Sequence, residues 1–123
     1  MKKIIPIVVL IFIFSCQGSD TYQGKWKVMD AKGNKLFIEF QTNDFSIYDS
    51  LGKNKNYSYT QNSIKYENSI KTYGITLEDG RAYKISFPTN DKNVAIILNE
   101  DDVKLFSLHR NRHQSFEEIY SLY

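Results

Sequence analysis

Residues 81–87 read RAYKISF, with apolar side chains at every second position: Tyr83, Ile85 and Phe87. Successive side chains of a β-strand point to opposite faces of the sheet, so this period of two predicts a strand with one buried face. An Asp-Gly pair, Asp79-Gly80, directly precedes the stretch and is typical of a tight hairpin turn. The stretch therefore indicates antiparallel β-structure.

Similar runs continue on both sides of this strand, with turn residues about every 8–12 positions. A turn is expected at Asn62-Ser63, and Val94–Leu98, apolar on both faces, is predicted to be the most buried strand. We therefore predict an all-β fold, an antiparallel meander of about eight strands. The other predicted runs are residues 25–29, 35–40, 45–47, 57–59, 64–66, 70–77 and 103–110.

The C-terminal residues 115–123 differ from the rest and predict a short helix. Ser115 followed three positions later by Glu118 has the form of a capping box. A helix this short is not stable alone, so its apolar face must pack on the barrel or on a partner protein. Phe116, Ile119, Tyr120 and Tyr123 share that face.

The N-terminus has the pattern of a bacterial lipoprotein signal peptide. Lys2 and Lys3 precede an apolar run at residues 4–14, which is too short to span a bilayer, because spanning takes about 20 residues. Ser15-Cys16 after this run resembles a lipobox, which implies cleavage before Cys16 and acylation of its thiol. The alternative is an ordinary secretory signal with an incidental cysteine.

These patterns divide the chain into a signal peptide (1–15), a lipidated cysteine with a short tether (16–21) and one β-barrel domain (22–123) that includes the helix. The tether reaches roughly 17 Å when fully extended, so the domain is expected to lie close to the bilayer. Gln17, where an aspartate would retain the protein at the inner membrane, favours the outer membrane, facing the periplasm.

Charge and composition argue against several classes of function. The chain has 16 basic and 14 acidic residues; removing residues 1–15 takes away two lysines and leaves 14 of each. Such a neutral domain lacks the excess positive charge of nucleic-acid-binding proteins. One cysteine excludes an internal disulfide, and no catalytic or phosphate-binding motif is present. We therefore expect no enzyme activity and no cofactor.

Metal sites are also not expected. His109, His113 and Glu117 are spaced by four, but His109 belongs to a predicted strand, so the three cannot share one helix. The acidic turn Asn99–Asp102 lacks the spacing of a calcium loop. We therefore expect both groups to be solvent-exposed polar residues without a bound metal.

Gly24-Lys25-Trp26 opens the first strand, and only antiparallel strands follow. This Gly-x-Trp pattern resembles the start of a lipocalin-type barrel, and small bacterial lipocalin-like lipoproteins are the closer comparison. The resemblance implies that Trp26 closes one end of the barrel and that a basic residue from the last strand, here Arg110, lies over its indole. The family's Thr-Asp-Tyr motif is not found. A different small barrel or sandwich, with Trp26 as an ordinary core residue, is the alternative.

An eight-stranded barrel is either filled by its own side chains or holds one small ligand. If it has a pocket, tyrosine rings and hydroxyls suit a small apolar, partly polar molecule. We therefore predict a membrane-anchored, non-catalytic protein that binds such a molecule or has a structural role in the envelope. The alternative is a protein-binding lipoprotein, such as an envelope-complex subunit, immunity protein or hydrolase inhibitor. The candidate ligand-lining residues are Tyr57, Tyr59, Tyr66, Tyr83 and Phe87.

Overall fold

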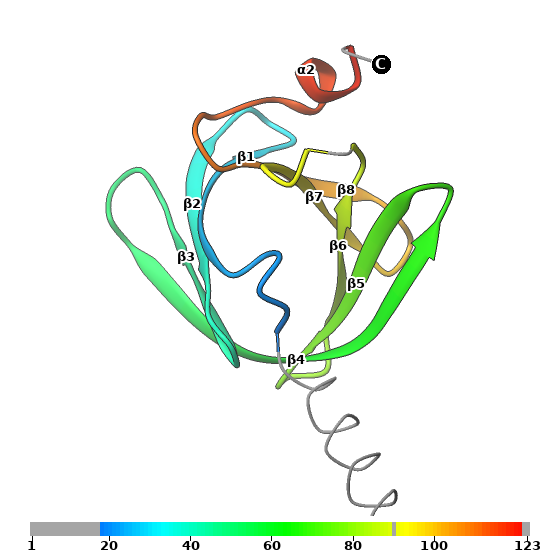
Figure 1. The fold of residues 1–123 in the computed structure, drawn as a ribbon. Coiled ribbons are helices and arrows are strands. Elements are labelled where there is room, and N and C mark those ends of the chain that lie inside the picture. The colour runs from blue at the N-terminus through cyan, green and yellow to red at the C-terminus, as the bar shows by residue number, and fades with distance from the viewer. Residues whose placement is uncertain (1–17, 90, 122–123) are drawn as a thin grey trace, which may run out of the picture.

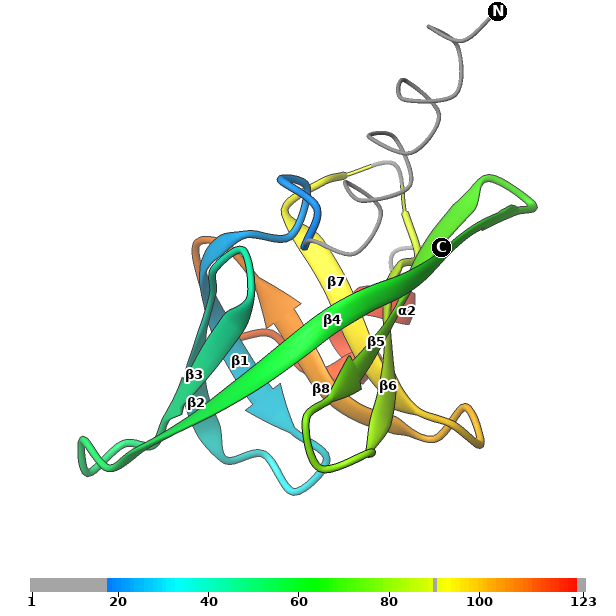
Figure 2. The same ribbon diagram turned by 90° about the horizontal axis from the view of Figure 1, so that it is seen from below.

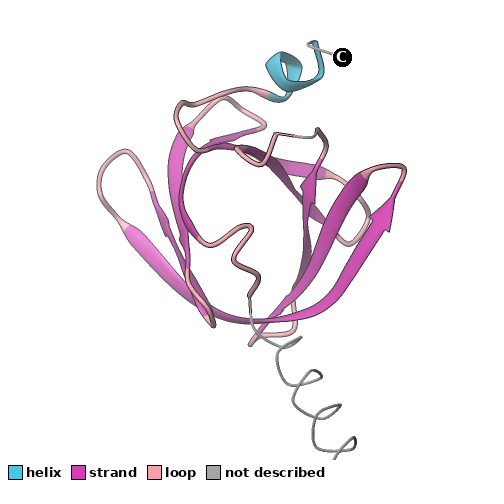
Figure 3. Ribbon diagram, in the orientation of Figure 1, coloured by secondary structure: helices cyan, strands magenta, loops and turns pink. Residues whose placement is uncertain are grey.

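The computed structural model describes residues 18–89 and 91–121, and in these residues eight antiparallel strands close into one barrel (Figure 1). Each strand pairs with the next along the chain, and β8 pairs with β1. The predicted all-β meander with a short C-terminal helix is confirmed (Figure 3). The elements are β1 (Gly24–Asp30), β2 (Lys35–Phe40), β3 (Asp44–Tyr48), β4 (Asn54–Glu67), β5 (Ile70–Leu77), β6 (Ala82–Phe87), β7 (Val94–Asn99), β8 (Lys104–His109) and α2 (Phe116–Ser121).

Side chains at alternate positions of the strands fill the barrel interior. In β6, Ile85 and Phe87 are buried while Lys84 and Ser86 are partly exposed, as the alternation predicts. β7 is buried on both faces from Val94 to Ile97, which confirms the prediction for this strand. Phe116 of the C-terminal segment covers the outward side chains of this strand, so both of its faces can be apolar.

The prediction of a turn at Asn62-Ser63 was wrong. These residues lie within β4, a single strand of 14 residues, where the pairing with β5 shifts between Gln61 and Ser63. Such a β-bulge inserts one residue and bends the strand without ending it. Before the bulge, the odd-numbered Tyr59 and Gln61 face inward. After it, the even-numbered Ile64 faces inward and pairs with the buried Tyr73.

Three hairpins share one turn construction. Asp30 accepts hydrogen bonds from the backbone amides of Lys32 and Asn34, and Asp49 accepts them from the amides of Leu51 and Lys53. Asn99 does the same for Asp101 and Val103. The residue before the last of each turn has a positive φ: Gly33, Gly52 and Asp102. An Asp or Asn side chain thereby satisfies the amides that the tight turn leaves unpaired.

The C-terminal helix α2 packs on its own domain. The amide of Glu118 donates to Ser115 Oγ at 3.2 Å and the amide of Ser115 to Glu118 Oε1 at 3.4 Å, so the predicted capping box is present. Phe116 packs against Val94 and Ile96 on the outside of β7. The side chains of residues 119–123 lie outside the described part of the chain.

Residues 18–23 enter the barrel from one end, and Figure 1 shows this segment inside the ring of strands. The Gly18 amide donates to the carbonyl oxygen of Thr42 at 2.9 Å, and the Ser19 amide donates to Gln61 Oε1 at 3.0 Å. Cys16 and the signal-peptide pattern lie outside the described residues. Within residues 18–89 and 91–121, no helix has the length and hydropathy to cross a membrane.

Candidate ligand-binding site

Trp26 closes the end of the barrel that the N-terminal segment enters. Its side chain is 1 % exposed, and its Nε1 donates to the carbonyl oxygen of Tyr22 at 2.8 Å. The Arg110 guanidinium lies over the indole, 3.6 Å from the ring centroid, which is the arrangement that the lipocalin resemblance implied. Burial lowers the pKa of Arg110 below its usual value. Arg110 also donates to the carbonyl oxygens of Lys25 and Thr21, at 3.0 and 3.2 Å.

Gly24, the first residue of the Gly-x-Trp pattern, meets two constraints. Its φ is +99°, a conformation that residues with a side chain rarely adopt. A Cβ added to it would lie 3.1 Å from Arg110 Nη1. The glycine therefore allows Arg110 to approach the strand and reach Trp26.

Three tyrosines and one glutamine form a buried polar cluster beside Trp26. The Tyr22 hydroxyl donates to Gln61 Oε1 at 2.7 Å, and the Tyr59 hydroxyl donates to the carbonyl oxygen of Gln41 at 2.6 Å. Burial raises the pKa of Tyr22 to about 12 and also raises the pKa of Tyr59. Tyr73 completes the cluster, with its ring centroid 5.0 Å from that of Tyr22. The bonds from Tyr22 to Gln61 and from Ser19 to Tyr73 hold the N-terminal segment in the barrel, and the Tyr59 hydroxyl is taken up by Gln41.

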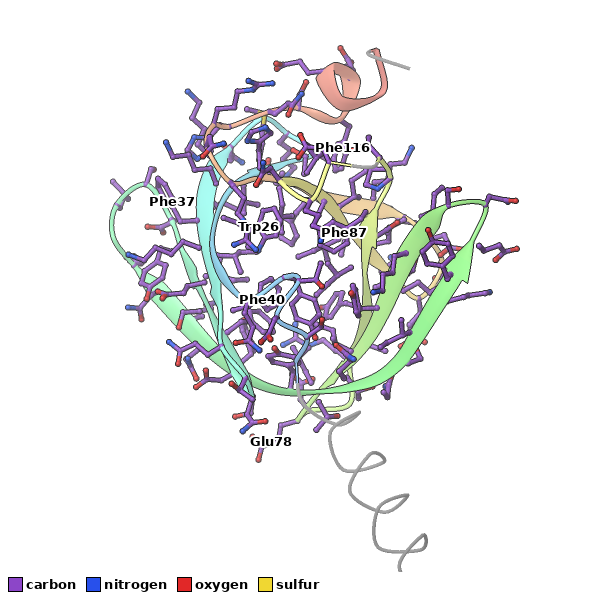
Figure 4. The ribbon with its side chains drawn as sticks, in the orientation of Figure 1. Trp26, Phe37, Phe40, Glu78, Phe87 and Phe116 are labelled. Atoms are coloured by element: carbon purple, nitrogen blue, oxygen red, sulfur yellow. The ribbon has the colours of Figure 1, made fainter. Side chains whose placement is uncertain are left out.

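The opposite end of the barrel holds a cavity of about 590 Å³. Figure 4 shows Trp26, Phe40 and Phe87 pointing into the ring of strands, whereas Phe37 points outward. The walls of the cavity are mainly apolar, and all eight strands contribute to its lining. The walls include Ile38, Phe40, Phe45, Ile47, Ile75, Leu77, Ile97 and Phe106. A volume of this size is in the range of sites for small molecules. The side chains therefore fill one end of the barrel and leave a cavity, partly lined by aromatic residues, at the other.

Three cationic side chains and one acidic side chain line the rim of the cavity. Lys32, Arg81 and Lys104 line it from three hairpins, and Asp30 is the acidic residue among its lining. The Asp30 carboxylate accepts hydrogen bonds within its own turn, and these bonds, with Lys32, keep its pKa low despite some burial. Cationic side chains around an apolar cavity favour a ligand with an apolar body and an anionic end.

Arg81 is held in place at this rim. Its guanidinium lies 5.2 Å from the ring centroid of Tyr57 and forms a 2.8 Å ion pair with Asp79. The hydrogen bond to Asp79 raises the pKa of Arg81 and lowers that of Asp79. Arg81 Nη1 also lies 3.4 Å from the hydroxyl of Tyr83. The cation is thus ordered beside two tyrosine rings, and the side chain is half exposed.

The structure separates the predicted lining residues into three groups. Tyr57 and Tyr83 line the cavity. Tyr59 and Phe87 are buried in the core at the closed end, where Phe87 packs against Trp26, so the prediction that they line the pocket was wrong. Tyr66 is 71 % exposed and is not part of the cavity lining, so its assignment to the pocket was wrong. It lies on the inward face of β4, but on the part of the strand that projects beyond the barrel.

The residues considered for a metal site lie apart. His109 is on β8, Glu117 is on α2, and His113 Nε2 lies 3.0 Å from the carbonyl oxygen of Leu36. Among residues 18–89 and 91–121, no group of three His, Cys, Asp or Glu side chains could hold a metal ion. The acidic turn 99–102 instead closes the β7–β8 hairpin.

His109 provides a prediction about pH. The side chain is 6 % exposed, and its Nδ1 accepts a hydrogen bond from the amide of Asn111 at 3.0 Å. Burial and the nearby Arg112 lower its pKa, and Asp91 opposes this only in part. The folded protein disfavours protonated His109, whereas the unfolded chain protonates this histidine near its usual pKa of 6.5. The stability that depends on neutral His109 is therefore present above pH 6.5 and is lost as the pH falls below that value.

We therefore expect the free energy of unfolding to decline between pH 7 and pH 5 and to decline less in a His109→Gln variant. Denaturant unfolding at several pH values measures this. Equal pH dependence of the two proteins in that window would contradict the assignment to His109.

Compared with known proteins, the chain matches no family model, and no curated protein or solved structure is significantly similar to it. The candidate site is therefore defined by its own geometry. Sequence patterns did not identify Arg81, Lys32 or Lys104 as members of one site. The available signal was that each lies in or beside a predicted turn, and every second turn of a meander lies at the same end of the barrel.

Proposed function

We propose that this protein is a lipid-anchored, lipocalin-like binding protein of the bacterial envelope, whose ligand is a small apolar molecule with an anionic end. The observation that supports the proposal best is the apolar cavity of about 590 Å³ with three cations at its rim. The apolar walls would take the body of the ligand and exclude water from it. The cationic groups of Lys32, Arg81 and Lys104 would lie near its charge at the opening.

The two ends of the barrel suit this role in a tethered protein. Residues 18–23, next to the proposed lipidated Cys16, fill the closed end, and the cavity opens at the other. The mouth would thus face away from the membrane and into the periplasm. Gln17 favours the outer membrane as the site of attachment. The proposed role is transport or capture of the ligand, without catalysis.

A fluorescence titration tests ligand binding. An apolar probe with a sulfonate group (anilinonaphthalene sulfonate) should bind, and Ile47→Trp should weaken binding by about tenfold or more, about 1.4 kcal/mol, because the indole occupies the cavity. Tyr48→Trp is the matched control, since Tyr48 is next in sequence, pairs with Phe37 on the outer face and is absent from the lining. Equal binding by both variants, or none by the wild type, would refute a ligand site here.

The predicted alternative, a protein-binding lipoprotein, has less support from the described residues. The C-terminal helix was one proposed partner surface, yet its Phe116 already packs on the barrel wall. The polar residues 50–56, a second candidate surface, form the tight β3–β4 turn and the start of β4. The cavity therefore favours the small-molecule function over this one.

A further inference from the structure

We propose that the tip of the β4–β5 hairpin is a second membrane contact, which lies in the interfacial region of the bilayer beside the lipidated N-terminus. This inference rests on the lipid anchor of the proposed function and is independent of the ligand cavity. The tip comprises residues 64–71. Figure 2 shows the hairpin projecting well beyond the body of the barrel.

The projecting tip exposes apolar side chains that the barrel does not cover. Gln61 and Tyr73 are buried, whereas the next apolar residues toward the turn are open to solvent: Ile64 is 55 %, Tyr66 71 % and Ile70 37 % exposed. Ile64 and Tyr66 lie on one face and Ile70 on the other. Insertion of the tip into an interface would cover both faces, whereas docking of a flat partner would cover one.

The tip is rigid enough to hold this position. Asn68 and Ser69 both have positive φ, at 54° and 66°, as the two-residue hairpin turn requires. The two strands remain paired up to Glu67 and Ile70. The side chains at the tip are therefore held by a regular ladder of hydrogen bonds.

The topology places the tip at the anchored end of the molecule. In an up-and-down barrel, successive turns lie at opposite ends, so the β4–β5 turn lies with the N-terminal segment, and the β3–β4 turn lies with the cavity mouth. The N-terminal segment contacts the hairpin next to the tip: Ser19 Oγ lies 3.5 Å from the hydroxyl of Tyr73, which pairs with Ile64 of the tip.

The distances also fit. Cys16 is three residues from Ser19, at most about 10 Å of extended chain. The turn at Ser69 is four residues from Tyr73, roughly 14 Å along the strand. Acyl chains on Cys16 and the hairpin tip can therefore reach the same membrane surface.

The residue types at the tip suit a bilayer interface. Tyrosine and isoleucine place apolar groups at the boundary of the hydrocarbon, and lysines extend to the headgroups. Lys71 lies with its Nζ 5.4 Å from the Tyr73 ring centroid. Lys65 pairs with Glu67 at 3.6 Å, but both side chains are at least 66 % exposed, so this pair is weak. Anionic phospholipids would attract both lysines.

Fluorescence quenching tests the contact in the full chain, processed in bacteria and reconstituted into vesicles of phosphatidylethanolamine and phosphatidylglycerol. Tyr66→Trp adds a reporter at the tip, and Leu51→Trp adds a matched one at the opposite end, where Leu51 is 83 % exposed. The fluorescence of the buried native Trp26 is measured in the wild-type protein and subtracted from the spectra of both variants. Brominated lipids should quench the reporter at position 66, with a blue-shifted spectrum, and leave that at position 51 unchanged.

Each outcome separates the two proposals. If the variants sediment with vesicles but neither reporter is quenched, or both are quenched equally, the hairpin contact is refuted while the anchor stands. If the processed proteins do not sediment with vesicles, the anchor fails and the hairpin inference fails with it.

Discussion

Replacing Trp26 by alanine is expected to lower the free energy of unfolding by about 3–5 kcal/mol, which is the cost of removing a large buried aromatic side chain. Small domains have about 5–15 kcal/mol in total, so the variant is expected to be close to unfolding. Trp26 is 1 % exposed, and its loss would also leave Arg110 partly buried without the ring beneath it. Urea unfolding followed by circular dichroism measures the change.

A matched control is Leu51→Ala, because Leu51 is 83 % exposed and should change stability little. Trp26→Phe keeps a ring beneath Arg110 and should cost less than Trp26→Ala. A loss below about 1 kcal/mol for Trp26→Ala would mean that the residue is peripheral. In that case the closed end described above would not stabilise the barrel.

Replacing Cys16 by alanine is expected to move the protein from the membrane fraction to the soluble fraction and to abolish labelling with palmitate. Each buried methylene contributes roughly 0.8 kcal/mol to membrane binding, and one chain alone binds weakly, so loss of all acylation should release the domain. The exposed hairpin tip alone is not expected to retain it. Fractionation of labelled cells, with mass spectrometry of the purified protein, measures both effects.

The Leu51→Ala protein is the control for this experiment too, since it should remain labelled and bound. A wild-type N-terminus that begins at residue 16 and carries acyl mass would agree with the prediction. Persistent palmitate labelling of Cys16→Ala would contradict it. A wild-type protein that is cleaved elsewhere and lacks acyl mass would favour the alternative of an ordinary secretory signal.

The strands could be predicted because the signal is local. In β6 and β7, burial of one or both faces appears directly as a pattern of period two or as a continuous apolar run. The same holds for the capping box at Ser115 and Glu118, whose partners are three residues apart. Asn62-Ser63 misled the prediction because a bulge and a turn use similar residue types.

Tyr66 illustrates the limit of the local signal. Alternation places it on the inward face of β4, but only the length of the barrel beside it decides whether an inward side chain is covered. Its 71 % exposed ring therefore changed from a candidate for ligand binding to a candidate for membrane contact. Strand face and burial are separate properties at the end of a long hairpin.

The amino-acid sequence by itself determined the strand order and the faces of most strands, because these follow from neighbours in the chain, and it predicts the lipid anchor at Cys16. Only the tertiary structure decided that one end of the barrel is filled and the other hollow. Arg110 reaches Trp26 across 84 positions, and the cations of the rim come from three different hairpins. Closure of the sheet brings these distant residues together. How side chains from separate strands pack inside the barrel depends on its three-dimensional geometry and cannot be predicted from a local sequence pattern.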